Sequence, residues 1–156
     1  MIPTIKNNVL LSFLAFLLIM FGACSGDTDQ KQTTDTENNG LTAFELQHGI
    51  GPVTEEVELG EFKQEMADRG RQIFQMKCEA CHMADTRIVG PPLGDVLERR
   101  SPAFVMNMIL NPGEMTREHP EGIKLMQEYM APMPFQNVTV DDARAIVEYL
   151  RIISDE

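Results

Sequence analysis

Cys78-Glu79-Ala80-Cys81-His82 is the most informative stretch of this chain, because it places two thiols beside one imidazole. Thiols three residues apart lie on one turn of a helix, so both can reach the same bound group while the adjacent imidazole faces its centre. A thioredoxin-like dithiol opens a helix after a strand, whereas this motif closes a helical pattern. A closed zinc site needs a second pair of Cys or His ligands. The motif therefore indicates covalent attachment of haem, with His82 directed at the iron.

The first 23 residues indicate export. Lys6 precedes 13 mostly apolar residues, Val9 to Phe21, a run that is short for a bilayer span but typical of a secretory h-region. Two small residues then stand before Cys24, as in a bacterial lipobox. We expect a lipoprotein-type signal peptide at residues 1–23 and lipid on Cys24. Phe21 stands where lipoproteins usually carry Leu, so ordinary cleavage or an uncleaved anchor remain the alternatives.

Cysteine usage agrees with this division. The chain has three cysteines in 156 residues, and an exported protein would otherwise leave one thiol unpaired. With lipid on Cys24 and haem on Cys78 and Cys81, none is left over. A disulfide between the last two is the alternative, but it would close too small a loop to stabilise a fold much.

An acidic segment follows the expected anchor. Residues 24–40 have almost no apolar content and are expected to be a lipid anchor and disordered linker, reaching about 20–25 Å. Residues 41–60 mix apolar residues with glycine and proline, which predicts an irregular arm packed on the domain, with His48 at its surface. One lysine and eight carboxylates lie in Ser25–Gly60, against 11 basic and 16 acidic residues in Glu61–Glu156. This balance speaks against nucleic-acid binding.

Residues 61–156 carry helical periodicity. Apolar residues recur at three- and four-residue spacing from Phe62 to Lys77. Gly70 lies on that apolar face, where glycine costs about 1 kcal/mol relative to alanine. We therefore expect another helix backbone to approach closely at this position.

Three further helices follow in the pattern. Ser101-Pro102 indicates an N-cap and first turn, and Asn111–Gly113 should end that helix. A short helix is expected over Glu121–Met130. The last helix begins at Thr139 as N-cap, with a capping box to Asp142. Since no run alternates with the period of a strand, the domain is expected to be all-α, with about four helices.

Residues 62–153 resemble the class I c-type cytochromes. Gly70 and Phe74 stand eight and four residues before Cys78, where that family packs its first helix against its last, and Ile146 and Tyr149 match the answering positions. The resemblance implies a small class I cytochrome c fold around one covalently bound haem. Phe74, Leu93, Phe104 and Leu150 are then expected to form walls of the haem pocket.

Gly90-Pro91-Pro92-Leu93 is similar to the loop beneath the proximal histidine of that family. The resemblance implies that the Pro91 carbonyl accepts a hydrogen bond from the second imidazole nitrogen of His82, which orients the ring. A plain proline-glycine turn is the alternative. Nearby, Arg99 and Arg100 are expected to be solvated rather than close to the haem propionates.

The sixth iron ligand must be sought among many methionines. Met133 stands between Pro132 and Pro134, which stiffen the segment and disfavour helix there, and the family places its axial methionine in this context. His119 and Met115 are the alternatives. The methionines in predicted helices are expected to pack in the core: Met106, Met108, Met126 and Met130.

These features together predict a membrane-tethered one-electron carrier of a respiratory chain, with His82 and Met133 as haem ligands, facing the periplasm. The alternatives are a fixed subunit of a respiratory reductase or oxidase, and an open-site haem enzyme or gas sensor. Segments 49–52 (GIGP) and 106–112 (MNMILNP) are similar to small cytochromes of anaerobic respiration, which makes nitrous oxide reductase a candidate redox partner.

Overall fold

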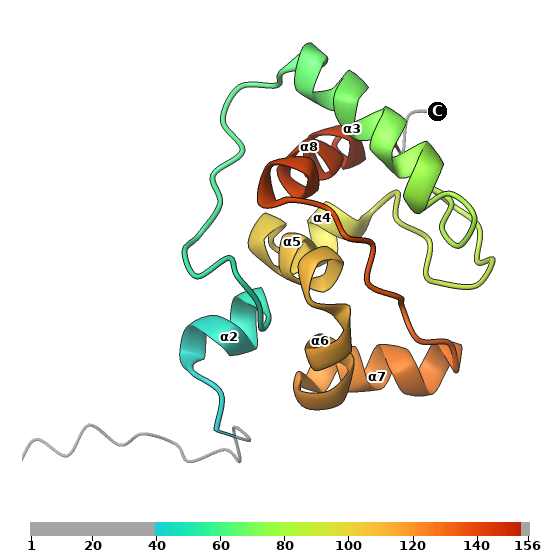
Figure 1. Ribbon diagram of the computed structural model, residues 1–156. Helices are drawn as coiled ribbons and strands as arrows, with labels where there is room; N and C mark the ends of the chain where they lie inside the picture. The colour runs from blue at the N-terminus through green and yellow to red at the C-terminus, as the bar shows by residue number, and fades with distance from the viewer. Residues whose placement is uncertain (1–39, 154–156) are drawn as a thin grey trace, which may run out of the picture. The chain divides into compact units, whose positions relative to one another are not determined.

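The computed structural model describes residues 40–153, so the expected signal peptide, Cys24 and the linker up to residue 39 lie outside the described residues. The described range is helical, with no strand beyond an isolated bridge between His82 and Arg87. The expected all-α class is confirmed. In chain order the helices are α2 (Ala43–His48), α3 (Gln64–Lys77), α4 (Val96–Arg99), α5 (Pro102–Leu110), α6 (Pro112–Glu118), α7 (Pro120–Tyr129) and α8 (Val140–Leu150) (Figure 1).

Helices α3 and α8 cross at the centre of the packing. A Cβ on Gly70 would overlap the carbonyl oxygen of Ala145, so the two backbones meet there, as predicted. One turn further along, the rings of Phe74 and Tyr149 stack edge to face with centroids 5.4 Å apart. The crossing brings the end of α3, which leads into the Cys78 motif, onto the buried face of α8.

Local capping sets most helix ends where the sequence predicted them. Thr139 caps α8, and its hydroxyl and the Asp142 carboxylate form the expected capping box. Ser101 caps α5 through a hydrogen bond from the Phe104 N–H, 3.1 Å. Asn111 ends α5 as expected, but Pro112 then starts α6 at once, because proline suits the first position of a helix.

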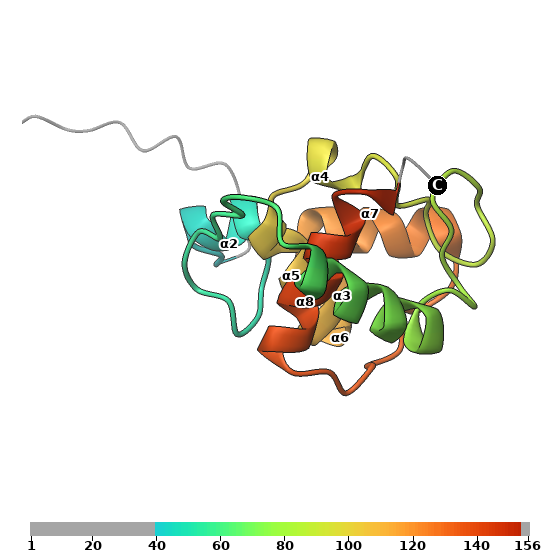
Figure 2. The ribbon, with the colours of Figure 1, turned by 90° about the horizontal axis from the view of Figure 1, so that it is seen from above.

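The arm at residues 41–60 is more ordered than predicted, because it begins with the six-residue helix α2. The arm lies at the end of the domain opposite the loop that follows His82 (Figures 1 and 2). His48, expected at the surface, is buried at 5% exposure. Its Nδ1 lies 2.8 Å from the Ser101 hydroxyl, so the ring fills the space between the arm and α5.

The amide of Asn107, fully buried in α5, fixes the middle of the arm. Its Nδ2 donates to the carbonyls of His48 at 3.0 Å and Val53 at 2.9 Å, and its Oδ1 accepts from the Val53 N–H at 3.0 Å. Asn111 adds a hydrogen bond to the Ile50 carbonyl, 3.3 Å. Segments 49–52 and 106–112 are therefore packed against each other.

A buried carboxylate fixes the end of the arm to α8. Glu148 has no exposed surface, pairs with Arg144 at 2.6 Å and Arg151 at 2.8 Å, and accepts from the Lys63 N–H at 2.9 Å. The two guanidinium groups also donate to the carbonyls of Leu59 and Gly60. Every buried side-chain nitrogen or oxygen within residues 40–153 has a hydrogen-bond partner.

Among residues 40–153, the helices are too short or too polar for any of them to cross a bilayer.

Candidate cofactor site

A deep, open-mouthed cavity lies between the loop that follows α3 and the helices α5, α7 and α8. The space among its lining residues, with the open solvent at its mouth included, is about 1280 Å³. Apolar side chains form its walls, among them all four residues predicted for that role: Phe74, Leu93, Phe104 and Leu150.

Both thiols of the motif line this cavity. The chain leaves α3 at Cys78, and the N–H groups of Cys81 and His82 both donate to the Cys78 carbonyl at 3.0 Å. This tight turn places the two sulfur atoms and the imidazole along one wall. Burial raises the pKa of the Cys78 thiol to about 11, with Lys77 opposing the rise and Cys81 adding to it. Before any group is attached to it, the thiol is therefore protonated at neutral pH.

The imidazole of His82 is held in one orientation. Its Nδ1 lies 2.9 Å from the Pro91 carbonyl oxygen, the hydrogen bond expected for this loop. A carbonyl can only accept, so Nδ1 carries the proton and the lone pair of Nε2 is available for a metal. Gly90 makes room for the ring, because a Cβ there would overlap the imidazole. The Gly90 N–H also donates to the Cys81 carbonyl at 2.9 Å.

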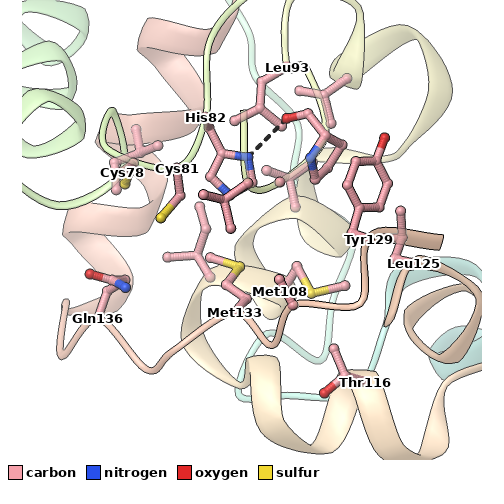
Figure 3. A pocket seen from close by; sticks show the side chains of 18 of the residues that line it. Cys78, Cys81, His82, Leu93, Met108, Thr116, Leu125, Tyr129, Met133 and Gln136 are labelled. Carbon is pink, nitrogen blue, oxygen red and sulfur yellow. Dashed lines mark hydrogen bonds between the residues drawn. The ribbon is translucent and has the colours of Figure 1, made fainter. Parts of the chain in front are cut away.

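The thioether of Met133 faces His82 across the cavity (Figure 3). Met133 belongs to the extended segment 130–139, which connects α7 to α8 and is called here the strap. Lys77 donates to the Gln136 carbonyl at 3.0 Å and so ties the strap to the end of α3. The strap thus places a soft sulfur donor opposite the imidazole.

The two alternative ligands lie elsewhere and are already engaged. His119 is 1% exposed; its Nε2 donates to the Glu45 carbonyl at 3.1 Å and its Nδ1 accepts from the Glu121 N–H at 3.1 Å. The sulfur of Met115 is fully buried and accepts from the Ile50 N–H at 3.0 Å. Neither residue lines the cavity. Both instead form hydrogen bonds with the arm.

The helical methionines divide into three groups. Met106 is buried in the core as predicted. Met108 and Met126 line the cavity instead. The prediction was wrong for Met130, which is 80% exposed because it caps α7 in a left-handed conformation that turns the chain into the strap.

Arg99 and Arg100 also border the cavity; Arg99 is solvated as expected, with 44% of its side chain exposed, and Arg100 is half-buried. Arg99 donates to the Pro92 carbonyl at 3.1 Å and to Asp95 at 2.7 Å. Arg100 pairs with Glu121 and lies over the Phe104 ring at 5.2 Å. Their alkyl stems cover apolar wall while the charged ends stay near water.

These residues fit a haem group. Two thiols lie on one turn, an imidazole with its Nδ1 held by a carbonyl faces a thioether, and the cavity walls are largely apolar, with Arg99 and Arg100 also among the lining residues. Proteins attach haem covalently through cysteine side chains, and they ligate its iron with imidazole and thioether groups. Fold and site together define a small helical protein built around a covalently bound haem.

The chain belongs to the cytochrome c family, whose model, described as Cytochrome c, matches residues 67–154. It is similar to the solved structure of cytochrome c from Rhodothermus marinus, with 40% identity and a TM-score of 0.67, over 71% of this chain and 96% of that one. An engineered form of the same cytochrome bound to a carbene intermediate is 39% identical, with a TM-score of 0.64, over 72% and 97%. No curated protein matches significantly.

Family membership makes this chain a monohaem c-type cytochrome with covalently bound haem c, and hence an electron-transfer protein. The Cys78–His82 motif is consistent with attachment of the haem through the thiols of Cys78 and Cys81. Sequence reasoning did not identify Gly90 as the residue that makes room for the imidazole. The sequence did offer a signal for Gly90, because it directly precedes Pro91, the residue predicted to contact His82.

Proposed function

We propose that this cytochrome is a lipid-anchored one-electron carrier of a respiratory chain, with His82 and Met133 as the axial ligands of its haem. The observation that supports the ligand pair is the position of Met133, whose thioether faces the imidazole across the cavity while His119 and Met115 are held by the arm. Haem iron supplies reversible one-electron chemistry when the group is bound.

The chain's own residues hold both ligands still. Pro91 fixes the ring of His82, and the strap's prolines and its contact with Lys77 restrict Met133. A site with both axial positions filled has no open position for a substrate. This supports electron transfer between proteins rather than catalysis at the iron.

Several exposed apolar side chains stand next in sequence to residues that line the cavity, and they support contact with a redox partner there. They lie in the loop that follows His82 and in the strap, and their exposure is 46% for Met83, 46% for Ile88, 80% for Met130 and 63% for Phe135. Apolar contact around the cavity brings the redox centre of the partner close to the haem. Such contact does not require ion pairs in a fixed geometry. We expect partner binding to depend little on salt.

Substitution of Met133 tests the ligand assignment. In the Met133→Ala holoprotein the oxidised form should lose its thioether-to-iron charge-transfer band, and the reduced form should bind carbon monoxide readily, whereas the wild type should not. Met108→Leu is the matched control, since it removes another thioether of the same cavity wall and should leave both properties unchanged. Carbon monoxide binding by the reduced wild type at rest would instead favour an open-site enzyme or sensor.

The proposed anchor rests on the sequence around Cys24, and the cell envelope, facing the periplasm, is the proposed location. Cys24→Ser should move the cytochrome from the membrane fraction to the soluble fraction of the envelope and abolish incorporation of labelled fatty acid. Retention of the label on the variant would contradict lipid attachment at Cys24.

The proposed partners are redox proteins of the respiratory chain, with nitrous oxide reductase as one candidate. A fixed place in a reductase or oxidase complex is the alternative. Mild membrane extraction separates the two, because a mobile carrier should be recovered alone and a fixed subunit should copurify stoichiometrically with its complex.

A further inference from the structure

The loop that follows His82 is a closed unit, and Arg87 lies within it. His82 and Arg87 form an isolated antiparallel bridge. The loop is closed again by hydrogen bonds from the Leu93 N–H to the Met83 carbonyl at 2.9 Å and from the Gly94 N–H to the Ala84 carbonyl at 2.7 Å. The backbone that carries Arg87 is therefore connected directly to the backbone that carries His82.

The side chain of Arg87 reaches from the His82 loop to the C-terminal end of α7. Its Nη2 donates to the Glu128 carbonyl at 3.0 Å, and its guanidinium carbon lies 4.2 Å from the centre of the Tyr129 ring. Tyr129 itself lines the cavity, at the edge away from Cys78 (Figure 3). One residue thus connects the His82 loop to α7 by a hydrogen bond and a cation–π contact.

The contact of Arg87 lies at the last turn of α7, where a positive charge stabilises a helix most. The last carbonyls of a helix have no partner within it and carry partial negative charge, so a cation near them is stabilising. The last turn of α7 has no basic residue of its own. Arg87, 41 residues away in sequence from Glu128, fills this role.

The end of α7 is also the origin of the strap. Met130 caps the helix with a φ of 52°, and the chain then runs through Ala131 and Pro132 to Met133. Only Ala131 and the stiff Pro132 separate the cap from Met133, and Pro134 follows directly, so the segment has little freedom to move the thioether. A force that holds the end of α7 therefore also limits how far Met133 can move from the cavity.

We propose that Arg87 is a positioning residue that fastens the His82 loop to the start of the strap, and so slows the release of Met133 from the iron. This inference rests on the proposed His82/Met133 ligation. The contact closes one edge of the cavity and couples the two axial sides, so its loss should raise access to the iron without removing either ligand.

The test is the exchange of Met133 for imidazole, a neutral ligand, in the oxidised full-length holoprotein. Arg87→Ala should keep the thioether-to-iron band at rest but bind imidazole about two- to fivefold faster, as loss of an exposed cation–π contact implies. Amide hydrogen exchange in residues 130–135 should rise in the same variant. Tyr129→Leu should match Arg87→Ala, and the double variant should add little to either.

Two controls separate this contact from the loss of any positive charge. Arg87→Lys keeps a cation beside the Tyr129 ring and should exchange imidazole closer to the wild-type rate than Arg87→Ala does. Arg117→Ala removes an exposed positive charge from α6 and should have no effect. Unchanged rates in Arg87→Ala, or an equal rise in Arg117→Ala, would overturn the role of Arg87 alone. Absence of the thioether band in the wild type would overturn the Met133 ligation, and this role with it.

Discussion

At the scale of single residues, the site depends on how tightly the imidazole of His82 is surrounded. The Pro91 carbonyl fixes one nitrogen at 2.9 Å, and Gly90 lies against the ring where no Cβ fits. Two adjacent backbone positions therefore set both the tautomer and the placement of the imidazole. A short loop with little side-chain chemistry thus orients the group that the proposed function assigns to the iron.

Gly90→Ala should displace the imidazole, because the added methyl group would overlap the ring. We expect partial loss of the low-spin oxidised spectrum and a destabilisation of about 1–3 kcal/mol, typical of overpacking. Electron paramagnetic resonance and thermal unfolding of the holoprotein measure the two effects. Gly113→Ala is the control, since its Cβ would meet only the mobile end of Arg117, and it should leave the spectrum unchanged.

Single residues also mark the limit of sequence reasoning. Spacing and family resemblance predicted Cys78, His82 and Met133 as site residues, because such motifs depend on local order along the chain, and all three line the same cavity. The contact of Arg87 with Tyr129 could not be predicted, since it joins distant segments through tertiary packing. His119 was misjudged as a candidate ligand, because nothing local showed that its two nitrogens bind backbone groups of the arm and of α7.

At the scale of helices, the crossing of α3 and α8 positions the haem motif. Gly70→Ala would force the two backbones apart at Ala145, because the neighbouring atom is a carbonyl that cannot turn away. We expect a loss of about 3 kcal/mol or more in the free energy of unfolding, beyond the usual cost of overpacking. Denaturant titration measures it, and a Gly70→Ala protein as stable as the wild type would contradict the close crossing.

Glu148 makes the junction of the arm and α8 sensitive to acid. Burial opposes its charge, but the Lys63 N–H and the guanidinium groups of Arg144 and Arg151 outweigh burial and lower its pKa below 4.5. Because the folded state binds the proton less tightly than the unfolded state, the stabilisation is complete above about pH 4.5 and is lost as the pH falls through the lowered value.

Glu148→Gln should therefore lower the free energy of unfolding by about 2–4 kcal/mol near neutral pH, because it leaves two arginines around a neutral amide. The difference from the wild type should shrink as the pH is taken below 4.5. Urea titrations at several pH values measure it, with Asp141→Asn on the exposed face of α8 as control. A difference that stays constant at low pH would contradict the assigned charge.

Helix ends were predictable where side chains cap them, as at Ser101 and Thr139. The short helices α4 and α6 were not predicted, because a single turn or two shows no periodicity. Helix α2 was also missed, although Thr42 and Glu45 form a capping box that the sequence displays. Gly49, Gly51 and Pro52 follow directly, and their presence favoured the prediction of an irregular segment.

At the scale of the whole domain, the packing of residues 40–153 is built around the haem cavity, whose walls come from α3, the His82 loop, α5, α7, the strap and α8. The arm closes the opposite end through Asn107, Met115 and His119. Segments 49–52 and 106–112, read from sequence as a sign of the redox partner, have a structural explanation in this contact.

Removal of haem attachment should therefore unfold much of the domain, because its apolar walls would enclose no group. In Cys78→Ser/Cys81→Ser we expect loss of the near-ultraviolet circular dichroism and of a cooperative thermal transition, with helical signal partly retained. The single variant Cys24→Ser, which keeps the haem thiols, should unfold as the wild type does. A cooperative transition in the double variant would show that the helices pack without the haem.

The central claim is a single haem that passes one electron between two stable, six-coordinate states. A potentiometric titration of the full-length holoprotein, followed by absorption, tests it most directly. We predict one transition with a one-electron slope, and a thioether-to-iron band that disappears in step with reduction. An oxidised form without that band, or more than one transition, would contradict the account.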